Sequence, residues 1–549
     1  MAELTPDIET VPELKSSSSL TGPLGNGGGT ATPDVQSVAM KMERAKEAYK
    51  GYAGNEEKPA RVEVWSWYLY EFCSYFIQSV LMPVVFPLII SQIVSGPPAP
   101  EHGDSFNSRG LLCRDKEMIL YQGLTQRSIP ANNSKFSPLE WTSISWAIGL
   151  LIVAPILSPI SFLLDHGQKQ SLVAATAIGI GVIFCLPVGF FKTPWIFLPY
   201  ITAIVAAHTI AGACHTRHLG LMVRGFTGPF LRERQFPIRR SISGWLSVYA
   251  TAAGCTGSAT IAAFAYHMLR EAPNQEFISL WVVSIFSGLQ WLVGILHVFT
   301  SANRTCETIL ISSPSKRHAF SIFKYPHAIG SLAGVFLSSF TTMCVFTGGV
   351  LFLVGNLCLT PLFLLYIWLI YFIFPMFSLP LLQPLQHLIK ADAVKMQLLG
   401  FLLLTATTGA GFYFKEESWE NRFVLFFAAV HSTSTGLLHA FGRVLLLDCS
   451  PSGKEGAFSI WYTWVKALGT SMGFAVASIA PGKIATSFGI AFWTAMVGIV
   501  LLILGNISDF GGALAAKNVG DDSEKGSPVH GMDTGVLLQS REFADGETP

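Results

Sequence analysis

The fold is decided by a run of apolar residues near the middle of the chain. Residues 326–355 read PHAIGSLAGVFLSSFTTMCVFTGGVLFLVG, and residues 357–382 read LCLTPLFLLYIWLIYFIFPMFSLPLL, with no Asp, Glu, Lys or Arg in either stretch. A helix crosses the hydrocarbon core of a bilayer with about 20 mainly apolar residues. The run therefore predicts two membrane-spanning helices, and Gly355-Asn356 is the predicted turn between them.

The composition extends this interpretation to the whole chain. Of its 549 residues, 50% are hydrophobic and only 13% are charged, and the mean hydropathy is +0.46. Soluble domains carry about 25% charged residues, so there are too few charges here to cover a water-exposed surface. The net charge of +1 gives no indication of a nucleic-acid partner. A soluble enzyme, a disordered chain and a disulfide-stabilised small domain are all disfavoured.

Comparable apolar stretches recur along the chain and predict an all-α membrane protein of about twelve transmembrane helices in two six-helix halves. The expected spans are 65–94, 139–164, 170–191, 194–214, 242–268, 277–300, 326–355, 357–382, 394–414, 422–448, 457–480 and 484–507.

Polar segments separate and flank these spans. We expect a disordered N-terminal tail over 1–62 and no cleavable signal peptide. The N-terminal half covers 63–300 and includes a long loop at 95–138. A basic central loop at 301–325 precedes the C-terminal half at 326–507, and a C-terminal tail covers 508–549.

The distribution of Lys and Arg predicts the orientation. Short loops on the side of the N-terminus hold most of the basic residues, which indicates that both termini face the cytosol. The loop 95–138 then faces a lumen or the outside. It contains the sequence Asn132-Asn133-Ser134, so Asn132 is a candidate for N-glycosylation, with a chance tripeptide as the alternative.

A short motif follows the second span. Residues 161–169, SFLLDHGQK, resemble the cytosolic loop of the major facilitator superfamily. Asp165, Gly167 and Lys169 match that motif in kind. Asp165 can cap a neighbouring helix and pair with a cation, and Gly167 permits a positive φ in a tight turn. Making and breaking the aspartate contact would gate the cytosolic face, whereas the alternative is an ordinary polar turn.

Two further motifs resemble the autophagy-related vacuolar effluxer family of that superfamily. The first opens the first span as WSWYLYEFCS, residues 65–74, with Glu71 where the family carries Asp. The second has Arg443, an acid five residues later, and then PSGKE at 451–455. The matching positions are Trp67, Tyr68, Tyr70, Glu71, Arg443, Asp448, Pro451, Gly453, Lys454 and Glu455.

The resemblance implies a secondary active transporter that exports neutral amino acids from a vacuole lumen to the cytosol by alternating access. It implies a vacuolar membrane protein. We expect no enzymatic activity and no cofactor, and we expect no metal site because no Cys/His cluster has metal-ligand spacing. The tail segment DTGVLL is similar to an acidic di-leucine sorting signal, so Asp533, Leu537 and Leu538 are candidates for binding sorting adaptors.

Polar residues inside the expected cavity-lining spans are candidates for substrate binding or coupling. They are Glu71, Gln78, His208, His439, Arg443 and Lys466. A zwitterionic substrate needs a cation for its carboxylate and an acid or carbonyls for its ammonium. Arg443 and Lys466 suit the first role and Glu71 the second. The alternative is that Arg443 pairs with Glu71 or Asp448 and only ties helices together.

Other functions stay open at this point. Proton coupling through Glu71, His208 or His439 is one hypothesis, with hydrogen-bonded structural groups as the alternative. A carrier of another small solute, such as a sugar or an ion, fits the composition equally well, and so does a non-transporting sensor or scaffold. For a membrane-embedded enzyme, the only suggestive cluster is 215–218, HTRH, which we interpret as a helix end entering a basic loop.

Overall fold

The computed structural model describes most of the apolar part of the chain. The described residues are 58–94, 121–167, 170–228, 231–271, 278–301, 318–355, 357, 359, 361–414, 419–451, 453–479, 481, 483–516 and 519–520. Lys169, Asp533, Leu537 and Leu538 lie outside these ranges.

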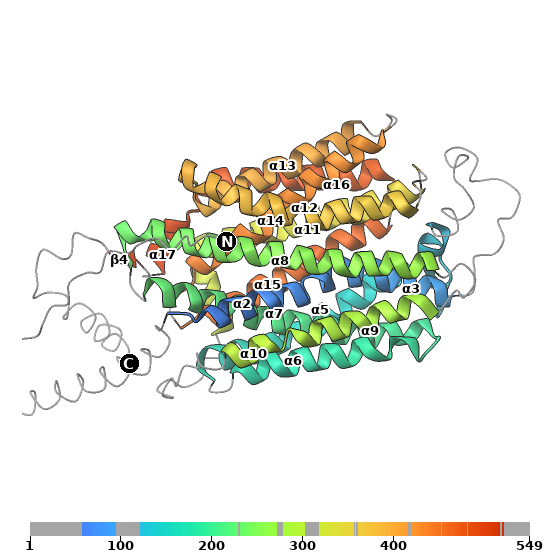
Figure 1. Ribbon diagram of the computed structural model, residues 1–549, viewed down its shortest axis with the longest axis horizontal. Coiled ribbons are helices and arrows are strands. Elements are labelled where there is room, and N and C mark those ends of the chain that lie inside the picture. Colours follow the sequence, from blue (N-terminus) through green and yellow to red (C-terminus); the bar gives the residue numbers. More distant parts are fainter. Residues whose placement is uncertain are drawn as a thin grey trace, which may run out of the picture. The chain divides into compact units, whose positions relative to one another are not determined.

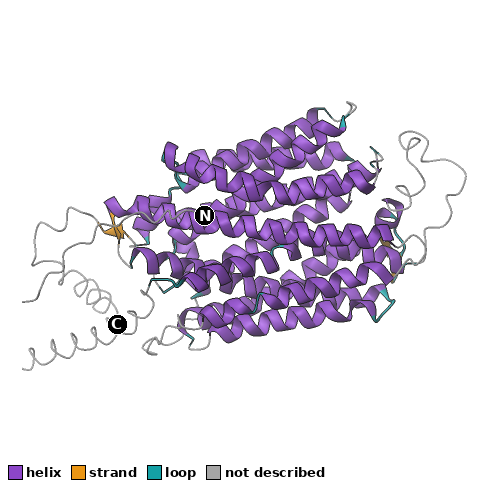
Figure 2. Cartoon of the chain, in the orientation of Figure 1, coloured by secondary structure: helices purple, strands orange, loops and turns teal. Residues whose placement is uncertain are grey.

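The described chain is almost entirely helical, and its long helices run side by side (Figures 1 and 2). The helices of the first part of the chain, which precedes residue 302, are α2 (Arg61–Ser74), α3 (Phe86–Ile93), α5 (Pro138–His166), α6 (Gln170–Cys185), α7 (Phe197–Thr227), α8 (Phe236–Glu271), α9 (Ile278–Val293) and α10 (Leu296–Ser301). Those of the second part are α11 (Pro326–Gly355), α12 (Pro361–Ile389), α13 (Ala393–Tyr413), α14 (Asn421–Asp448), α15 (Glu455–Ile479), α16 (Ile484–Leu504) and α17 (Asp509–Ala515).

Short elements complete the fold. Strands β1 (Ile129–Ala131) and β2 (Ser134–Phe136) form an antiparallel hairpin, and β3 (Leu231–Arg232) pairs in parallel with β4 (Val519–Gly520). Brief helical turns are η2 (Leu186–Gly189), η3 (Pro194–Ile196), η4 (Glu233–Gln235) and η6 (Ala319–Lys324).

Eleven of the described helical segments are long and apolar enough to cross a bilayer. Helix α11 ends at Gly355, as predicted, and Asn356 lies outside the described residues. Helix α15 corresponds to the predicted span 457–480 but is not among the eleven. It has 25 residues, and Ser, Thr, Tyr and Lys466 lower its hydropathy. It packs between α5, α7 and α11. Because much of its surface contacts other helices, few of its side chains need to be apolar.

The distribution of apolar side chains is that of a multi-pass membrane protein. Large apolar residues are exposed along α6, α12 and α16, for example Ile183 (64%), Leu381 (71%) and Trp493 (63%). Buried positions include many hydroxyl, imidazole and carboxylate groups. A water-soluble domain does not present such extended apolar surface to solvent, whereas a lipid-embedded bundle requires it.

The first span is not a regular α-helix. Between α2 and α3 the backbone forms a π-helical segment, η1 (Ile77–Val85), with Pro83 inside it. Proline has no backbone N–H to donate to the preceding turn, so it disturbs regular α-helical hydrogen bonding. Segments of π-helix are frequent at functional sites, and here the segment begins next to Gln78.

Helices from before and after the central segment 302–317 pack directly on one another. The principal pairs are α8 with α12, α5 with α15, α7 with α15, and α8 with α14. The closest packing within the second part is between α11 and α15. An added Cβ at Gly469 would lie 2.6 Å from the carbonyl oxygen of Phe336, and one at Gly473 would lie 2.3 Å from that of Phe340.

Several predicted boundaries differ from the structure. Helix α2 begins at Arg61, inside the expected N-terminal tail, and α17 lies inside the expected C-terminal tail. Asp509 of α17 is buried and pairs with Arg240 at 2.8 Å, which explains why this part of the tail is ordered. Helix α7 continues to Thr227, 13 residues beyond the expected end of its span at 214.

Candidate functional site

A cavity of about 110 Å³ lies in the middle of the bundle, between α2, η1, α7, α8, α11, α12, α14 and α15. It is larger than the space needed for one water molecule. All six residues predicted to bind substrate or to couple transport line it, although they come from four separate segments of the chain. They are Glu71, Gln78, His208, His439, Arg443 and Lys466.

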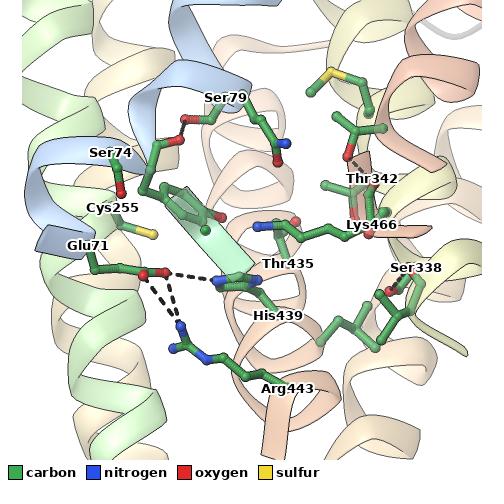
Figure 3. Close-up of a pocket in the computed structure, with 18 of the residues that line it drawn as sticks. Glu71, Ser74, Ser79, Cys255, Ser338, Thr342, Thr435, His439, Arg443 and Lys466 are labelled. Atoms are coloured by element: carbon green, nitrogen blue, oxygen red, sulfur yellow. Dashed lines mark hydrogen bonds and ion pairs between the residues drawn. The ribbon is translucent and has the colours of Figure 1, made fainter. Parts of the chain in front are cut away.

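The carboxylate of Glu71 is the centre of a buried polar cluster. Its Oε2 lies 2.7 Å from Nε2 of His215 and 3.3 Å from a guanidinium nitrogen of Arg443, and its Oε1 lies 3.0 Å from Nε2 of His439. Glu71 belongs to α2 and His215 to α7. His439 and Arg443 both belong to α14, and Figure 3 shows them on one side of Glu71. Because the site is buried, these contacts compensate for the loss of hydration around the carboxylate.

Arg443 is fixed on more than one side. Its Nε donates to the hydroxyl of Ser247 at 3.1 Å, a terminal nitrogen donates to the backbone carbonyl of Ser247 at 3.3 Å, and its guanidinium lies 5.1 Å from the Trp67 ring centre. Of the two structural pairings considered above, the structure has the one with Glu71. Asp448 contacts Arg239 at 3.2 Å. Arg443 therefore joins α14 to α2 and α8.

Lys466 projects into the cavity from α15, on the side opposite Glu71 (Figure 3). Its ammonium lies 5.4 Å from the centre of the Tyr75 ring, which is cation–π distance. Among the described residues no carboxylate forms an ion pair with it. Below it, His439 contacts the hydroxyl of Tyr462 at 3.3 Å. The cavity thus presents a lysine whose charge is not neutralised by a direct partner.

The rest of the wall combines hydroxyl and apolar groups. Phe346, Met343 and Phe372 provide an apolar surface. The side-chain Oε1 of Gln78 is buried in η1 and has no hydrogen-bond partner among the described residues. Further polar wall residues are Ser338, Ser339, Thr342, Ser432 and Thr435.

Two aromatic residues of the first motif enclose His215. Trp67 stacks on its ring at 4.6 Å and donates from its indole N–H to the backbone carbonyl of His215 at 3.1 Å. The ring of Tyr70 packs on it at 4.4 Å. Trp67 and Tyr70 are buried, whereas Tyr68 is only partly buried. These two motif aromatics therefore orient a histidine that contacts Glu71.

The interpretation of residues 215–218 as a helix end was wrong. All four are buried inside α7. His215 contacts Glu71, Arg217 contacts Gln170 at 2.6 Å, and His218 contacts Glu63 at 2.9 Å. The signal that was missed is their spacing, because His208, His215 and His218 share one helical face and no Gly-Pro stop occurs before 228–229. No group of described His, Cys, Asp and Glu residues has the geometry of a metal site.

Asp165, at the end of α5, caps the start of α15 in the second part of the chain. Its two carboxylate oxygens accept hydrogen bonds from the backbone N–H groups of Gly456 and Ala457, at 2.6 and 3.0 Å, in the first turn of α15. It also contacts His318 at 2.9 Å. This is the helix-end contact considered for the motif. Its gating role stays a prediction.

The turn after Asp165 differs from expectation. Gly167 has φ −80° and not a positive φ. Its lack of a side chain matters for another reason, because an added Cβ would lie 2.3 Å from the carbonyl oxygen of Leu163.

The PSGKE motif forms the connection between α14 and α15. Gly453 has φ +78°, a conformation that favours glycine. Pro451 and Lys454 close the turn through a backbone hydrogen bond of 3.2 Å. Glu455, at the first position of α15, forms a buried ion pair with Arg224 of α7. The motif thus anchors the start of α15 to the first part of the bundle.

Asn132 lies in the turn between β1 and β2 and is exposed. A glycosyltransferase needs an accessible loop of this kind.

Comparison with known protein families found no matching family model. No curated protein matches the chain either. The functional assignment therefore depends on the motifs and on the geometry of the cavity.

Proposed function

We propose that the protein is a secondary active transporter of the major facilitator type and that it carries neutral amino acids. The observation that carries the proposal is the central cavity, in which the ammonium of Lys466 faces a polar cluster built on Glu71. Ionisable residues inside membrane spans are costly and usually mark a substrate or ion pathway. A structural ion pair explains Arg443 but leaves Lys466 unexplained.

The groups around the cavity suit a zwitterion with an apolar side chain. Lys466 binds the substrate carboxylate. The Oε1 of Gln78, which has no described partner, accepts from the substrate ammonium, and the negative charge of Glu71 favours that end of the ligand. Phe346 and Phe372 contact the apolar side chain.

Alternating access follows from the packing of the two predicted halves. In this proposal α15 is the eleventh of twelve spans, and the halves meet along α5, α7 and α8 on one side and α12, α14 and α15 on the other. Contacts of Asp165, Arg224 and Arg239 close the end at which α2 begins. Rocking of the halves would break these contacts and open the cavity to that side. We assign that end to the cytosol and the protein to a vacuolar membrane.

The experiment is uptake into proteoliposomes containing the purified full chain, with a panel of radiolabelled amino acids. We expect saturable uptake of neutral amino acids and a loss of about tenfold or more in apparent affinity for Lys466→Gln, because one charge-assisted contact disappears. Lys395→Gln is the matched control, since Lys395 is exposed on α13 and lies outside the cavity.

Folding of each variant is checked by its thermal unfolding profile. The proposal is overturned if the folded wild type moves no amino acid, or if Lys466→Gln transports as well as Lys395→Gln. Saturable uptake of a sugar or an ion alone would retain the carrier mechanism and replace the substrate class.

A further inference from the structure

A second, smaller cavity lies beside the central one, within the first part of the bundle. It has a volume of about 40 Å³ and is bounded by α2, α5, α6, α7 and α10. Three histidines line it, and their rings lie edge to face: His215 and His297 at 5.3 Å, and His218 and His297 at 4.9 Å between ring centres. We call it the histidine cavity.

Polar atoms in this cavity lack protein partners. Nδ1 of His215, Nδ1 of His297 and Nε2 of Gln170 are buried and have no hydrogen bond to any described residue. Buried polar groups are normally satisfied by protein or by ordered water. A polar cavity of this size has room for water, which needs about 10–15 Å³ and two to four polar partners. The imidazoles of His215 and His297 are therefore placed to be joined through water molecules, and the ring of His218 lies 4.9 Å from that of His297.

A buried carboxylate lies at each end of the histidine series. Glu71 contacts Nε2 of His215 at 2.7 Å and lines the central cavity. Glu63 contacts Nε2 of His218 at 2.9 Å and lies in the first turn of α2, at the end of the bundle. The order along the path is Glu71, His215, His297, His218, Glu63.

We propose that this series is a proton relay between the central cavity and the end of the bundle at which α2 begins. A proton on the Glu71 carboxyl passes to Nε2 of His215, and the imidazolium releases its Nδ1 proton to water in the histidine cavity. His297 and then His218 accept and release the proton in the same way, and Glu63 delivers it to solvent. One proton moves, each histidine returns to its neutral form, and no group is oxidised or reduced.

The charged groups around the path favour transfer of the proton from Glu71 along the histidines. Arg443 and His439 of α14 face Glu71 and stabilise its carboxylate, so a proton arriving there is passed on. Arg217 of α7 lines the histidine cavity but is held by Gln170 of α6 and lies 3.7 Å from Asp165 of α5. The remaining titratable groups in the wall are Tyr70 and Cys214.

His297 is the residue at which the relay can be tested separately from substrate binding. It lines the histidine cavity but not the central cavity, and its only described ring neighbours are Tyr70, His215 and His218. Two variants are used: His297→Gln keeps polarity, and His297→Phe keeps an aromatic ring beside Tyr70. His267→Gln, at an exposed histidine near the end of α8, is the control.

The inference rests on the proposed transport function, so the experiment measures two fluxes. Exchange of labelled for unlabelled amino acid across the liposome membrane needs no net proton movement, whereas a pH-sensitive dye inside the liposome reports proton entry during net uptake. For both His297 variants we expect proton entry to fall by about tenfold or more while exchange stays within about twofold of the wild type. The control should retain both fluxes.

The possible failures are distinguishable. If the wild type shows no exchange, the proposed transport function is overturned. If the wild type exchanges substrate but moves no protons, or if both His297 variants move protons at the wild-type rate, the relay is overturned and the transporter stands. Loss of exchange in both folded His297 variants would also overturn the relay, because it would assign His297 to substrate binding.

Discussion

At the scale of single residues, Glu71 and Arg443 form a buried pair whose members depend on each other. Removing one partner of such a pair leaves an uncompensated charge. We expect Arg443→Met to lower the free energy of unfolding by about 3–5 kcal/mol. In the double variant Glu71→Gln with Arg443→Met, part of the lost free energy of unfolding should be recovered, because no buried carboxylate is left without a partner. Denaturant unfolding in lipid–detergent micelles measures both.

Lys395→Met is the control for loss of a lysine charge at an exposed site, and it should unfold like the wild type. Strict additivity of the Glu71→Gln and Arg443→Met effects would show that the two side chains do not interact energetically, contrary to the 3.3 Å contact.

The individual candidates around the cavity could be predicted because charge is rare in apolar segments. Glu71, Arg443 and Lys466 stand out in sequences that otherwise avoid charge. Their partners could not be predicted in the same way. His215 and Glu71 lie 144 positions apart in the sequence, and only tertiary packing brings them together. Ser247 is one of many serines, and nothing local marks it as the acceptor for Arg443.

At the scale of helices, the contact between α11 and α15 depends on two glycines. Since a Cβ at Gly473 would lie 2.3 Å from a backbone carbonyl of α11, Gly473→Ala must push the two helices apart. We expect a destabilisation of about 1–3 kcal/mol, measured as a lower midpoint of thermal unfolding. Small residues permit such close approach between membrane helices.

Gly179→Ala is the matched control in α6, because nothing lies within 4 Å of an added Cβ there. It should leave stability unchanged or raise it by about 0.5–1 kcal/mol, through the better helix propensity of alanine. An unchanged Gly473→Ala midpoint would contradict the close packing of α11 on α15.

The cap that Asp165 places on α15 gives a second prediction at this scale. In Asp165→Ala, the backbone N–H groups of Gly456 and Ala457 lose their acceptors, and we expect the local stability of the α15 start to fall by about 0.5–2 kcal/mol. Hydrogen exchange measured by mass spectrometry should show faster exchange in peptides covering 455–460.

Asp392→Ala is the comparison, because Asp392 caps its own helix, α13, by accepting from the N–H of Lys395 at 2.7 Å. It should accelerate exchange only at the start of α13. Asp165 also contacts His318, so Asp165→Ala should additionally expose the segment 318–324. Exchange at α15 that is equal in the two variants would refute the capping role.

Helix ends were less predictable than helices, for a physical reason. Hydropathy ended the fourth span at 214 because His215, Arg217 and His218 are polar, but α7 continues because buried carboxylates and an amide contact these side chains. The same reason explains why α15 has a low hydropathy although it is a long helix of the bundle: its polar residues face the cavity and neighbouring helices. A polar residue ends a membrane span only where no partner is available.

At the scale of the whole molecule, the apolar pattern predicts that many helices cross a bilayer, and eleven segments of that kind are present. What it cannot predict is which helices touch. The pairs Arg224–Glu455, Arg239–Asp448 and Arg240–Asp509 each join residues more than 200 positions apart. The orientation prediction counts Arg224, Arg239 and Arg240 as loop residues, whereas in the structure they lie in α7 and α8. The orientation therefore needs a direct test.

Asn132 provides that test, because it lies in the exposed turn of the β1–β2 hairpin, next to the start of α5. If this end of the bundle faces the lumen, as we propose, Asn132 meets the glycosylation machinery during synthesis. The wild-type protein expressed in a eukaryotic cell should then run as a larger species that a glycosidase converts to the mass of Asn132→Gln.

Asn133→Gln keeps the sequon and serves as the matched control, since it changes the adjacent exposed asparagine without removing the acceptor. Glycosidase-insensitive wild type that runs with Asn132→Gln would leave the lumenal assignment without support. A glycan on a sequon introduced near the N-terminus would reverse the assignment outright, because the two ends of α2–α3 lie on opposite sides of the bundle.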